Sequence, residues 1–306
     1  MQTTIKSPVR FTGVGLHSGK PVKMTIQPAS AEYGIWFRRT DVEGDGLIAA
    51  RWDNVVRDVQ LCTRIANESG HEISTVEHVM AALSGCGIYN ALIEVDGPEM
   101  PILDGSARPF VQAIVSAGLR RLDAPVRVIE VLRPVEVRDG DAVARIEPSD
   151  TLYIEFQIDF DDAAIGRQGK FLNMSNGSFV RELCNSRTFC RLSDIDSMRA
   201  NGQALGGTFE NAVVVDGAEV LSPGGLRHED EAVRHKMLDA LGDLAMAGSP
   251  LLARYSGCRA GHALTNKLLR ALFAQPDAFR MVVCDKDTAA RLPGVGVRSI
   301  DIPVHA

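Results

Sequence analysis

Hydrophobic and polar positions alternate over residues 1–60, between glycines and prolines that interrupt the pattern. The alternation is regular at residues 22–27 and 48–52, and a period of two is typical of strands that bury one face. Strand-like patterns follow at residues 91–95, 126–131 and 152–158. The chain is therefore predicted to contain several short strands, with antiparallel pairing in its first part.

Helical spacing of apolar residues occurs twice before residue 120. Residues 77–83 predict a helix that Ser74 or Thr75 would cap, because their side chains can accept hydrogen bonds from free N–H groups at a helix start. Residues 109–117 predict a second helix, with Ser106 as its N-cap and a glycine directly after its last residue.

The chain has 306 residues, more than one hydrophobic core usually organises, so two domains are expected. Residues 120–126 separate the segments above from the later strand patterns, and they divide the chain into domains 1–122 and 123–306. Further helices are predicted at 232–243 and 263–273. Each domain then contains strands followed by helices, which predicts an α+β fold.

Residues 183–221 fit neither domain's pattern and are predicted to form a β-α-β insertion in the second domain. We expect a strand at 183–189, a short helix after Ser193, and a strand at 212–215 that turns into a hairpin at the next Asp-Gly pair. The apolar residues that line this insertion are Leu192, Ile195, Met198, Phe209, Ala212 and Val214.

Composition and charge narrow the classes of function. Hydrophobic residues make up 45% and charged residues 24%, which is ordinary for a globular protein. The net charge of −6 and the lack of a Lys/Arg-rich tract argue against nucleic-acid binding. Without a transmembrane-length apolar run or a signal-peptide pattern, we expect a cytoplasmic protein with no stable membrane insertion. The six cysteines form no C-x-x-C pair and are expected to be free, largely buried thiols.

The segment 232–243 carries His235, Asp239 and Asp243 at intervals of four residues. That interval returns side chains to one face of a helix, with Cβ atoms about 5–6 Å apart, so an imidazole and two carboxylates lie side by side. This face could be half of a metal site that takes another ligand from elsewhere. The alternative is a structural helix pair, which is the commoner role of a single His-x-x-x-Asp.

His78 is the candidate for the remaining ligand. A V-x-H-x-M pattern surrounds both His78 and His235 near predicted helix starts, a faint sign of internal duplication. Two histidines and one aspartate make the three protein ligands of a catalytic zinc site, which leaves a position for water. Glu77 projects about 100° away from His78 and could act on that water as a general base. Without a metal nearby, a solvated glutamate would be the favoured interpretation.

Three further side chains have both a chemical and an ordinary interpretation. His262 follows a glycine and precedes a helix, where a buried structural histidine is commoner; Asp243 could instead orient it as a protonated acid for a leaving amine. Thr188 is an ordinary strand residue unless its hydroxyl meets a developing oxyanion. Lys236 would weaken metal binding unless it serves an anion.

The glycine-rich segment 13–20 superficially resembles a phosphate-binding loop. It does not match G-x-x-x-x-G-K-[ST], and predicted strands rather than a helix follow it. We therefore predict a tight turn, with His17 at the edge of a site.

Five segments together resemble the UDP-3-O-acyl-N-acetylglucosamine deacetylases, the zinc amidases of lipid A synthesis in Gram-negative bacteria. The segments are S-T-V-E-H-V-M-A-A-L at 74–83, M-P-I-L-D-G-S-A at 100–107, S-R-T-F at 186–189, E-D-E-A-V-R-H-K-M-L-D-A-L-G-D at 229–243 and G-H-A-L-T-N-K-L-L at 261–269. The resemblance runs in order from about residue 3 to residue 300, which makes it far more specific than any one segment.

This resemblance implies two similar domains, each a β-sheet layer packed on α-helices, with the active site at the domain interface. It implies three zinc ligands, which are His78, His235 and Asp239. It also implies a general base, Glu77, a cationic His262 supported by Asp243, and Thr188 with Lys236 at the tetrahedral oxyanion.

The resemblance assigns the insertion to a passage for the substrate's 3-O-acyl chain. The residues expected to contact substrate are His17, Phe189, Leu192, Ile195, Met198, Phe209, Val214 and Arg259. The chain departs from the family pattern in two places. Arg259 stands where a lysine is common, and Cys190-Arg191 stand where a smaller and then an apolar residue are expected.

We therefore predict a monomeric Zn²⁺-dependent hydrolase that removes the N-acetyl group of a UDP-linked, 3-O-acylated glucosamine. Fe²⁺ also suits two imidazoles and a carboxylate. A first alternative is a metallo-amidase of the same architecture that acts on another acylated nucleotide sugar. A second is a metal-free binding module; the presence of every ligand and of the base favours an enzyme over it.

Overall fold

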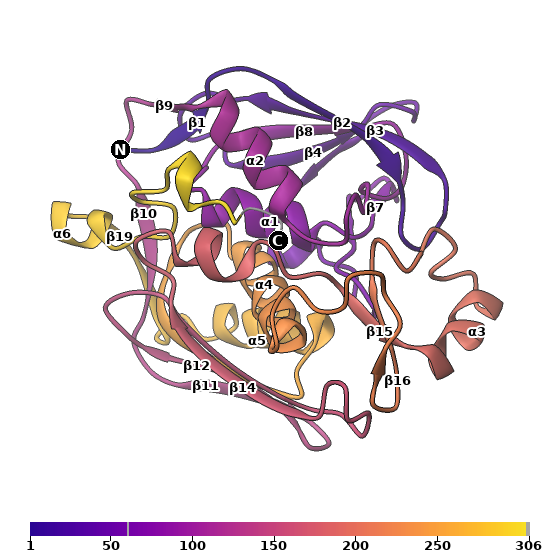
Figure 1. The fold of residues 1–306 in the computed structure, drawn as a ribbon. Helices are drawn as coiled ribbons and strands as arrows, with labels where there is room; N and C mark the ends of the chain where they lie inside the picture. The colour runs from indigo at the N-terminus through magenta and orange to yellow at the C-terminus, as the bar shows by residue number, and fades with distance from the viewer. Residues whose placement is uncertain (60, 304–306) are drawn as a thin grey trace.

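Two large β-sheets form outer layers of the protein, and helices lie between them (Figure 1). The computed structural model describes residues 1–59 and 61–303. Buried side chains from both halves of the chain join in one large hydrophobic core. Among the described residues, no helix combines the length and the apolar character needed to span a bilayer. All six cysteines are free, three of them buried and three half-buried.

The first half of the chain builds a five-stranded sheet with two long helices on it. The sheet order is β2 (Val9–Val14), β3 (Pro21–Pro28), β8 (Ala91–Val95), β4 (Ile35–Arg39) and β5 (Leu47–Ala49). The helices are α1 (Glu77–Gly85), α2 (Arg108–Ala117) and the short η1 (Trp52–Asn54). Two small ribbons pair β1 (Thr3–Ile5) with β9 (Leu119–Arg121) and β6 (Ile65–Ala66) with β7 (Glu72–Ile73). Alternate residues of β3 are buried, so the period-two pattern is confirmed there.

The second half builds a seven-stranded sheet. Its strands are β10 (Arg127–Val131), β11 (Val135–Asp139), β12 (Ala142–Pro148), β13 (Tyr153–Asp159), β14 (Arg167–Asn173), β18 (Leu251–Cys258) and β19 (Phe279–Val283). The long helices α4 (Glu231–Ala245) and α5 (His262–Phe273) pack on it. Shorter helical segments are η2 (Phe179–Leu183), α6 (Lys286–Ala290) and η3 (Ser299–Asp301).

The two halves repeat one topology. In the first, β2-β3-β8 are antiparallel neighbours, β8 pairs with β4 in parallel, and β5 closes the row. In the second, β11-β12-β18, β13 and β14 follow the same sequence of pairings. Because α1 precedes β8 and α4 precedes β18, the two helices that carry the V-x-H-x-M pattern hold equivalent places. The duplication and the α+β class are confirmed, whereas the boundary near residue 122 stays a prediction.

The insertion lies at one side of the molecule (Figure 1). It contains β15 (Phe189–Arg191), α3 (Leu192–Ala200), β16 (Val213–Asp216) and β17 (Glu219–Val220). The helix, the later strand and the hairpin are confirmed. The strand predicted at 183–189 is wrong, because η2 occupies its start and β15 begins only at Phe189. The N–H of Ser186 bonds to the Leu183 carbonyl and that of Arg187 to a carboxylate, so neither is available to a sheet.

Ser106 is confirmed as a cap of α2, because its hydroxyl oxygen accepts the main-chain N–H of Arg108, the first residue of that helix, at 3.2 Å. The predicted cap of α1 is wrong, since Val76 precedes that helix and makes no side-chain hydrogen bond to it. Thr75 instead adopts a φ of 60° and donates its hydroxyl to Glu99, 3.1 Å away. Contacts with distant residues thus override the local capping signal. The predicted end of α2 is confirmed, since Gly118 follows it with a φ of 74°.

Helices α1 and α4 pack closely because Gly242 has no side chain. A Cβ atom at Gly242 would lie 2.1 Å from the main-chain oxygen of Glu77. The first turn of α1 can therefore approach the middle of α4, which brings together residues from the two halves of the chain.

We expect Gly242→Ala to destabilise the protein by roughly 2–4 kcal/mol, because the added methyl group forces two helix backbones apart. The measurement is the free energy of unfolding in urea. Gly169→Ala is the matched control, since its Cβ would meet nothing closer than 3.7 Å. Equal stability of the two variants would contradict the close packing at Gly242.

Candidate metal centre

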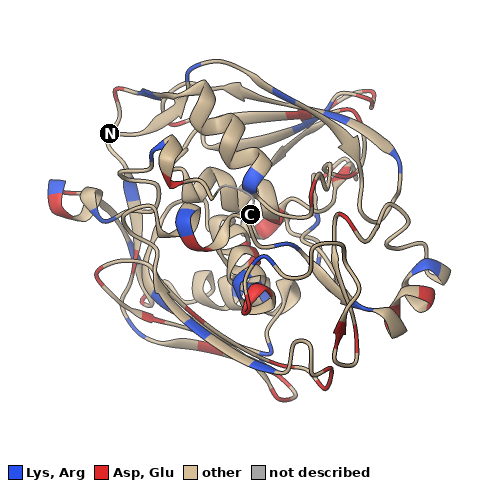
Figure 2. Cartoon of the chain, viewed as in Figure 1, with Lys and Arg blue, Asp and Glu red and all other residues tan. Residues whose placement is uncertain are grey.

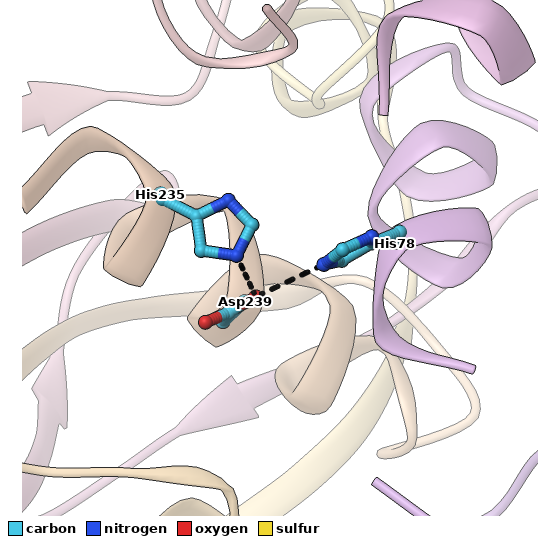
Figure 3. Close-up of side chains that lie close together, drawn as sticks. All are labelled: His78, His235 and Asp239. Carbon is cyan, nitrogen blue, oxygen red and sulfur yellow. Dashed lines mark ion pairs between the residues drawn. The ribbon is translucent and has the colours of Figure 1, made fainter. Parts of the chain in front are cut away.

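Three buried side chains from the two halves converge between α1 and α4. His78 comes from α1, and His235 and Asp239 from successive turns of α4 (Figure 3). One carboxylate oxygen, Oδ1 of Asp239, lies 3.2 Å from Nε2 of His235 and 3.7 Å from Nε2 of His78. The three candidate ligand atoms all lie within 4.8 Å of one another. The predicted ligand set is therefore brought together.

The donors in this cluster suit a metal ion such as zinc. Within the described residues, Oδ1 of Asp239 is buried without a hydrogen-bond partner, which is costly unless a cation or a donor supplies one. The Nδ1 atom of His235 lies 2.9 Å from the Ser186 carbonyl, so it carries the proton and Nε2 presents a lone pair. Two imidazole nitrogens and one carboxylate form a set that zinc binds in catalytic sites.

The protonation states of the three side chains also favour the binding of a cation. Burial lowers the pKa of His78 to about 3, and it likewise lowers the pKa of His235, so both imidazoles are neutral at pH 7. Burial alone would raise the pKa of Asp239, but His235 and Lys236 hold it below its usual range. The cluster thus presents one negative charge and two neutral nitrogens.

Glu77 lies next to the cluster at the start of α1. Its Oε2 accepts the Thr63 main-chain N–H at 3.0 Å, and its Oε1 lies 4.0 Å from Nε2 of His262. Burial raises the pKa of this carboxyl to about 8, although the nearby His262 opposes the rise. A carboxyl with a raised pKa at a buried site is suited to accept and release a proton near neutral pH.

His262 is held by a buried carboxylate. Its Nδ1 lies 2.9 Å from Oδ2 of Asp243, and Oδ1 of Asp243 accepts the Thr63 hydroxyl at 2.5 Å. Burial alone would lower the pKa of His262, but Asp243 raises it to about 9. The imidazole is therefore cationic at pH 7, with Nε2 toward Glu77. Thr63 contacts both carboxyls, and no motif in the sequence pointed to it.

The two predicted oxyanion residues, Lys236 and Thr188, make different contacts. Nζ of Lys236 is 3.2 Å from Oδ2 of Asp239, which pairs it directly with a ligand carboxylate. Thr188 is half-buried, with its N–H bonded to Gly105 and its carbonyl to the N–H of Val213. Thr188 is thus fixed between the first half and the insertion.

The predicted substrate residues are spread over a wider area. The Phe189 ring lies 6.5 Å from the His235 ring, and Nδ1 of His17 accepts the Ala204 N–H of the insertion. Of the insertion's apolar residues, Leu192 and Phe209 are exposed, Ile195 and Met198 half-buried, and Val214 buried.

The two departures from the family pattern each form ion pairs. Arg259 is half-exposed and donates to Asp159 at 2.6 Å, while Nε of Arg191 lies 2.9 Å from Asp162. These pairs tie the two arginines to the segment at the end of β13. In Figure 2, Lys and Arg positions are interspersed with Asp and Glu positions along the chain.

A cavity of about 540 Å³ lies elsewhere along the α1–α4 pair. Residues lining its apolar part include Met80, Leu83, Leu241 and Leu244. None of the candidate metal ligands, nor Glu77 or His262, lines it. The candidate metal centre is thus separate from this cavity.

Comparison with known proteins gives concordant matches. The model of a family described as UDP-3-O-acyl N-acetylglycosamine deacetylase matches residues 2–274. A UDP-3-O-acyl-N-acetylglucosamine deacetylase of Phenylobacterium zucineum is 48% identical over 94% of this chain and 98% of its own length. Proteins of the same name from Shewanella frigidimarina and Shewanella oneidensis are 47% and 46% identical over 94% of this chain, and the matches cover 94% and 95% of their lengths.

Proposed function

The chain belongs to the UDP-3-O-acyl N-acetylglycosamine deacetylase family, and we propose that it is a Zn²⁺-dependent hydrolase that releases acetate from a UDP-linked, 3-O-acylated N-acetylglucosamine in lipid A biosynthesis. The observation that carries the proposal is the buried cluster of His78, His235 and Asp239 with Glu77 and His262 beside it. The proposed metal ligands, base and acid therefore lie next to one another. Fe²⁺ fits the same ligands and would serve in the same way.

Zinc bound to the cluster would polarise the amide carbonyl and make a water molecule more acidic. Glu77 takes the proton of the attacking water, since its carboxylate is the proton acceptor beside the ligands. Thr63 holds the carboxylate through its N–H, which keeps one oxygen in place while the other faces the site.

The remaining residues stabilise charge and supply the proton for the leaving amine. Lys236 and Thr188 stabilise the oxyanion that develops when water adds to the acetamide carbonyl. His262, kept cationic by Asp243, donates a proton to the glucosamine nitrogen as the C–N bond breaks. Asp243 acts through His262 and is therefore a positioning residue.

The insertion would receive the 3-O-acyl chain. Support for this role comes from Leu192, Ile195 and Met198 on α3 and Val214 on β16, since both elements lie against β15; Phe209 is in the segment between α3 and β16. The residues proposed for the UDP-sugar side are His17, Phe189 and Arg259. Leu192 and Phe209 are exposed large apolar side chains, so they are accessible to an acyl chain.

The proposal is tested by acetate release from the acylated nucleotide sugar and from UDP-N-acetylglucosamine. We expect kcat/KM at least about a hundredfold higher for the acylated substrate, since burying four methylenes contributes about 3 kcal/mol. A chelator should abolish the activity and added Zn²⁺ restore it. Equal rates on the two substrates would contradict the acyl passage, and activity in metal-free protein would contradict the metal centre.

We expect Asp243→Asn to lower kcat about 10–100-fold at pH 7, because a neutral amide no longer keeps His262 protonated. Bound metal should stay near one ion per chain. Thr63→Val is the matched control, since it removes one hydrogen bond to Asp243 but leaves the carboxylate. Its kcat should fall less than about tenfold. Wild-type kcat in Asp243→Asn would contradict the role of His262 as a cationic acid.

A further inference from the structure

A buried ion pair lies beside the metal centre and takes no part in the proposed reaction. Nε and Nη2 of Arg187 lie 3.0 and 3.1 Å from the two carboxylate oxygens of Glu231, and both side chains are almost fully buried. We propose that this pair is a positioning clamp, which holds residues 186–188 against α4 so that His235 and Thr188 keep their places. The consequence for Thr188 rests on the proposed function; the consequence for His235 concerns metal binding alone.

Glu231 uses both of its carboxylate oxygens for the clamp. Besides the Arg187 guanidinium, Oε1 accepts the Arg187 main-chain N–H at 2.9 Å and Oε2 accepts the Arg227 N–H at 2.7 Å. Nη2 of Arg187 also donates to the Gly225 carbonyl at 2.7 Å. A buried carboxylate with four N–H donors is fixed in place, since any movement leaves a buried charged group short of a partner.

Helix α4 holds the segment through two residues that are four positions apart. Glu231 binds Arg187, and His235, one turn later on the same face, pairs its Nδ1 with the Ser186 carbonyl at 2.9 Å. Because Ser186 directly precedes Arg187, the clamp sets the position of the carbonyl that selects the His235 tautomer. That tautomer leaves Nε2 free to face Asp239, and partners of this kind strongly affect metal affinity.

Thr188 directly follows Arg187 and is hydrogen-bonded to residues outside α4. Its N–H donates to the Gly105 carbonyl at 2.9 Å, and its carbonyl accepts the Val213 N–H at 2.8 Å. Release of Arg187 would leave Thr188 attached to the first half and to the insertion, and it would remove the nearer of the segment's two links to α4, leaving the Ser186–His235 contact. The distance from Thr188 to the ligands on α4 would then be free to change.

A pair that only stabilises the fold predicts a different result from a clamp. Replacing a buried ion pair by apolar residues of similar volume is often neutral or stabilising. An apolar replacement of both residues separates the two roles, because it leaves no unpaired buried charge but removes the Arg187–Glu231 link between α4 and the segment. A pair that only stabilises the fold then changes the melting temperature and not the metal affinity.

The test compares the full-length wild type with the double variant Arg187→Met/Glu231→Leu, using Co²⁺ as the probe metal. We expect the Co²⁺ affinity to fall about 10–100-fold, the visible absorption of the Co²⁺ protein to change, and kcat to fall more than KM changes. The melting temperature should fall by roughly 5–15 °C, because the main-chain N–H groups of Arg187 and Arg227 lose their Glu231 acceptor. Lys170→Met is the control, because it breaks the Lys170–Asp230 pair at the same end of α4 and should leave all four readouts unchanged.

If the double variant fails to fold, the same measurements are made on Arg187→Lys. Lysine keeps the charge but cannot form the two-point contact with Glu231, so we expect Co²⁺ affinity about tenfold below wild type. A folded variant with wild-type Co²⁺ affinity and spectrum would overturn the clamp. Wild-type protein that binds no Co²⁺ would instead contradict the proposed function, so the two failures are distinguishable.

Discussion

Glu77→Gln should lower kcat for acetate release about a thousandfold while leaving one metal ion bound per chain. Glutamine has nearly the volume of glutamate and can still accept the Thr63 N–H, so the buried site keeps its shape. An amide cannot accept the proton of the attacking water, and Oε1 of Glu77 lies 4.0 Å from Nε2 of His262, which is itself 3.9 Å from Oδ2 of Asp239. The measurements are the rate of acetate release at saturating substrate and the metal content of the purified variant.

Glu72→Gln provides the control for this experiment. Glu72 lies on β7 five residues earlier, with a half-exposed side chain paired to Arg64, and its replacement should leave kcat within about twofold. If Glu77→Gln releases acetate as fast as wild type, Glu77 is not the base. If instead the variant loses its metal, Glu77 holds the metal ligands in place, and the experiment contradicts the prediction of one bound metal ion.

The part of the site on α4 follows from the sequence because helix geometry is local. His235 and Asp239 are four residues apart, so any helix over this segment places them on one face. The position of His78 is not local, since α1 meets α4 through tertiary packing that includes the close approach of Gly242 to Glu77. Its prediction depended on the chemistry of three-ligand sites and on the repeated V-x-H-x-M pattern. The repeated topology gives that pattern a structural basis, since both copies lie on equivalent helices.

What the sequence did not reveal depends on contacts between distant residues. Thr63 and Asp243 are 180 residues apart, and Arg187 and Glu231 are 44 residues apart, so no periodicity links them. The same cause explains the error at residues 183–189. An apolar pattern there suggests a strand, but the Arg187 N–H is taken by Glu231, which lies on a helix rather than in a sheet. Buried polar contacts of this kind decide local structure against propensity.

Asp239→Asn should weaken metal binding at least about a thousandfold and abolish acetate release, because it removes the anionic ligand. The Asp239 carboxylate is the negative charge that faces His78, His235 and Lys236. Asparagine keeps the size of the side chain but offers only an amide oxygen, a poor ligand for zinc. The measurements are metal per chain after gel filtration, acetate release, and urea unfolding to verify that the variant folds.

Asp230→Asn is the matched control, since Asp230 lies at the start of the same helix and pairs with Lys170 and Arg234 instead of the imidazoles. It should retain wild-type metal content. If Asp239→Asn binds metal as tightly as wild type, the metal binds at another site and the proposed mechanism is wrong. If it loses the metal but stays folded, the cluster is a functional site rather than a structural one. Because His78 comes from α1 and Asp239 from α4, metal binding then also reports that the two halves are docked.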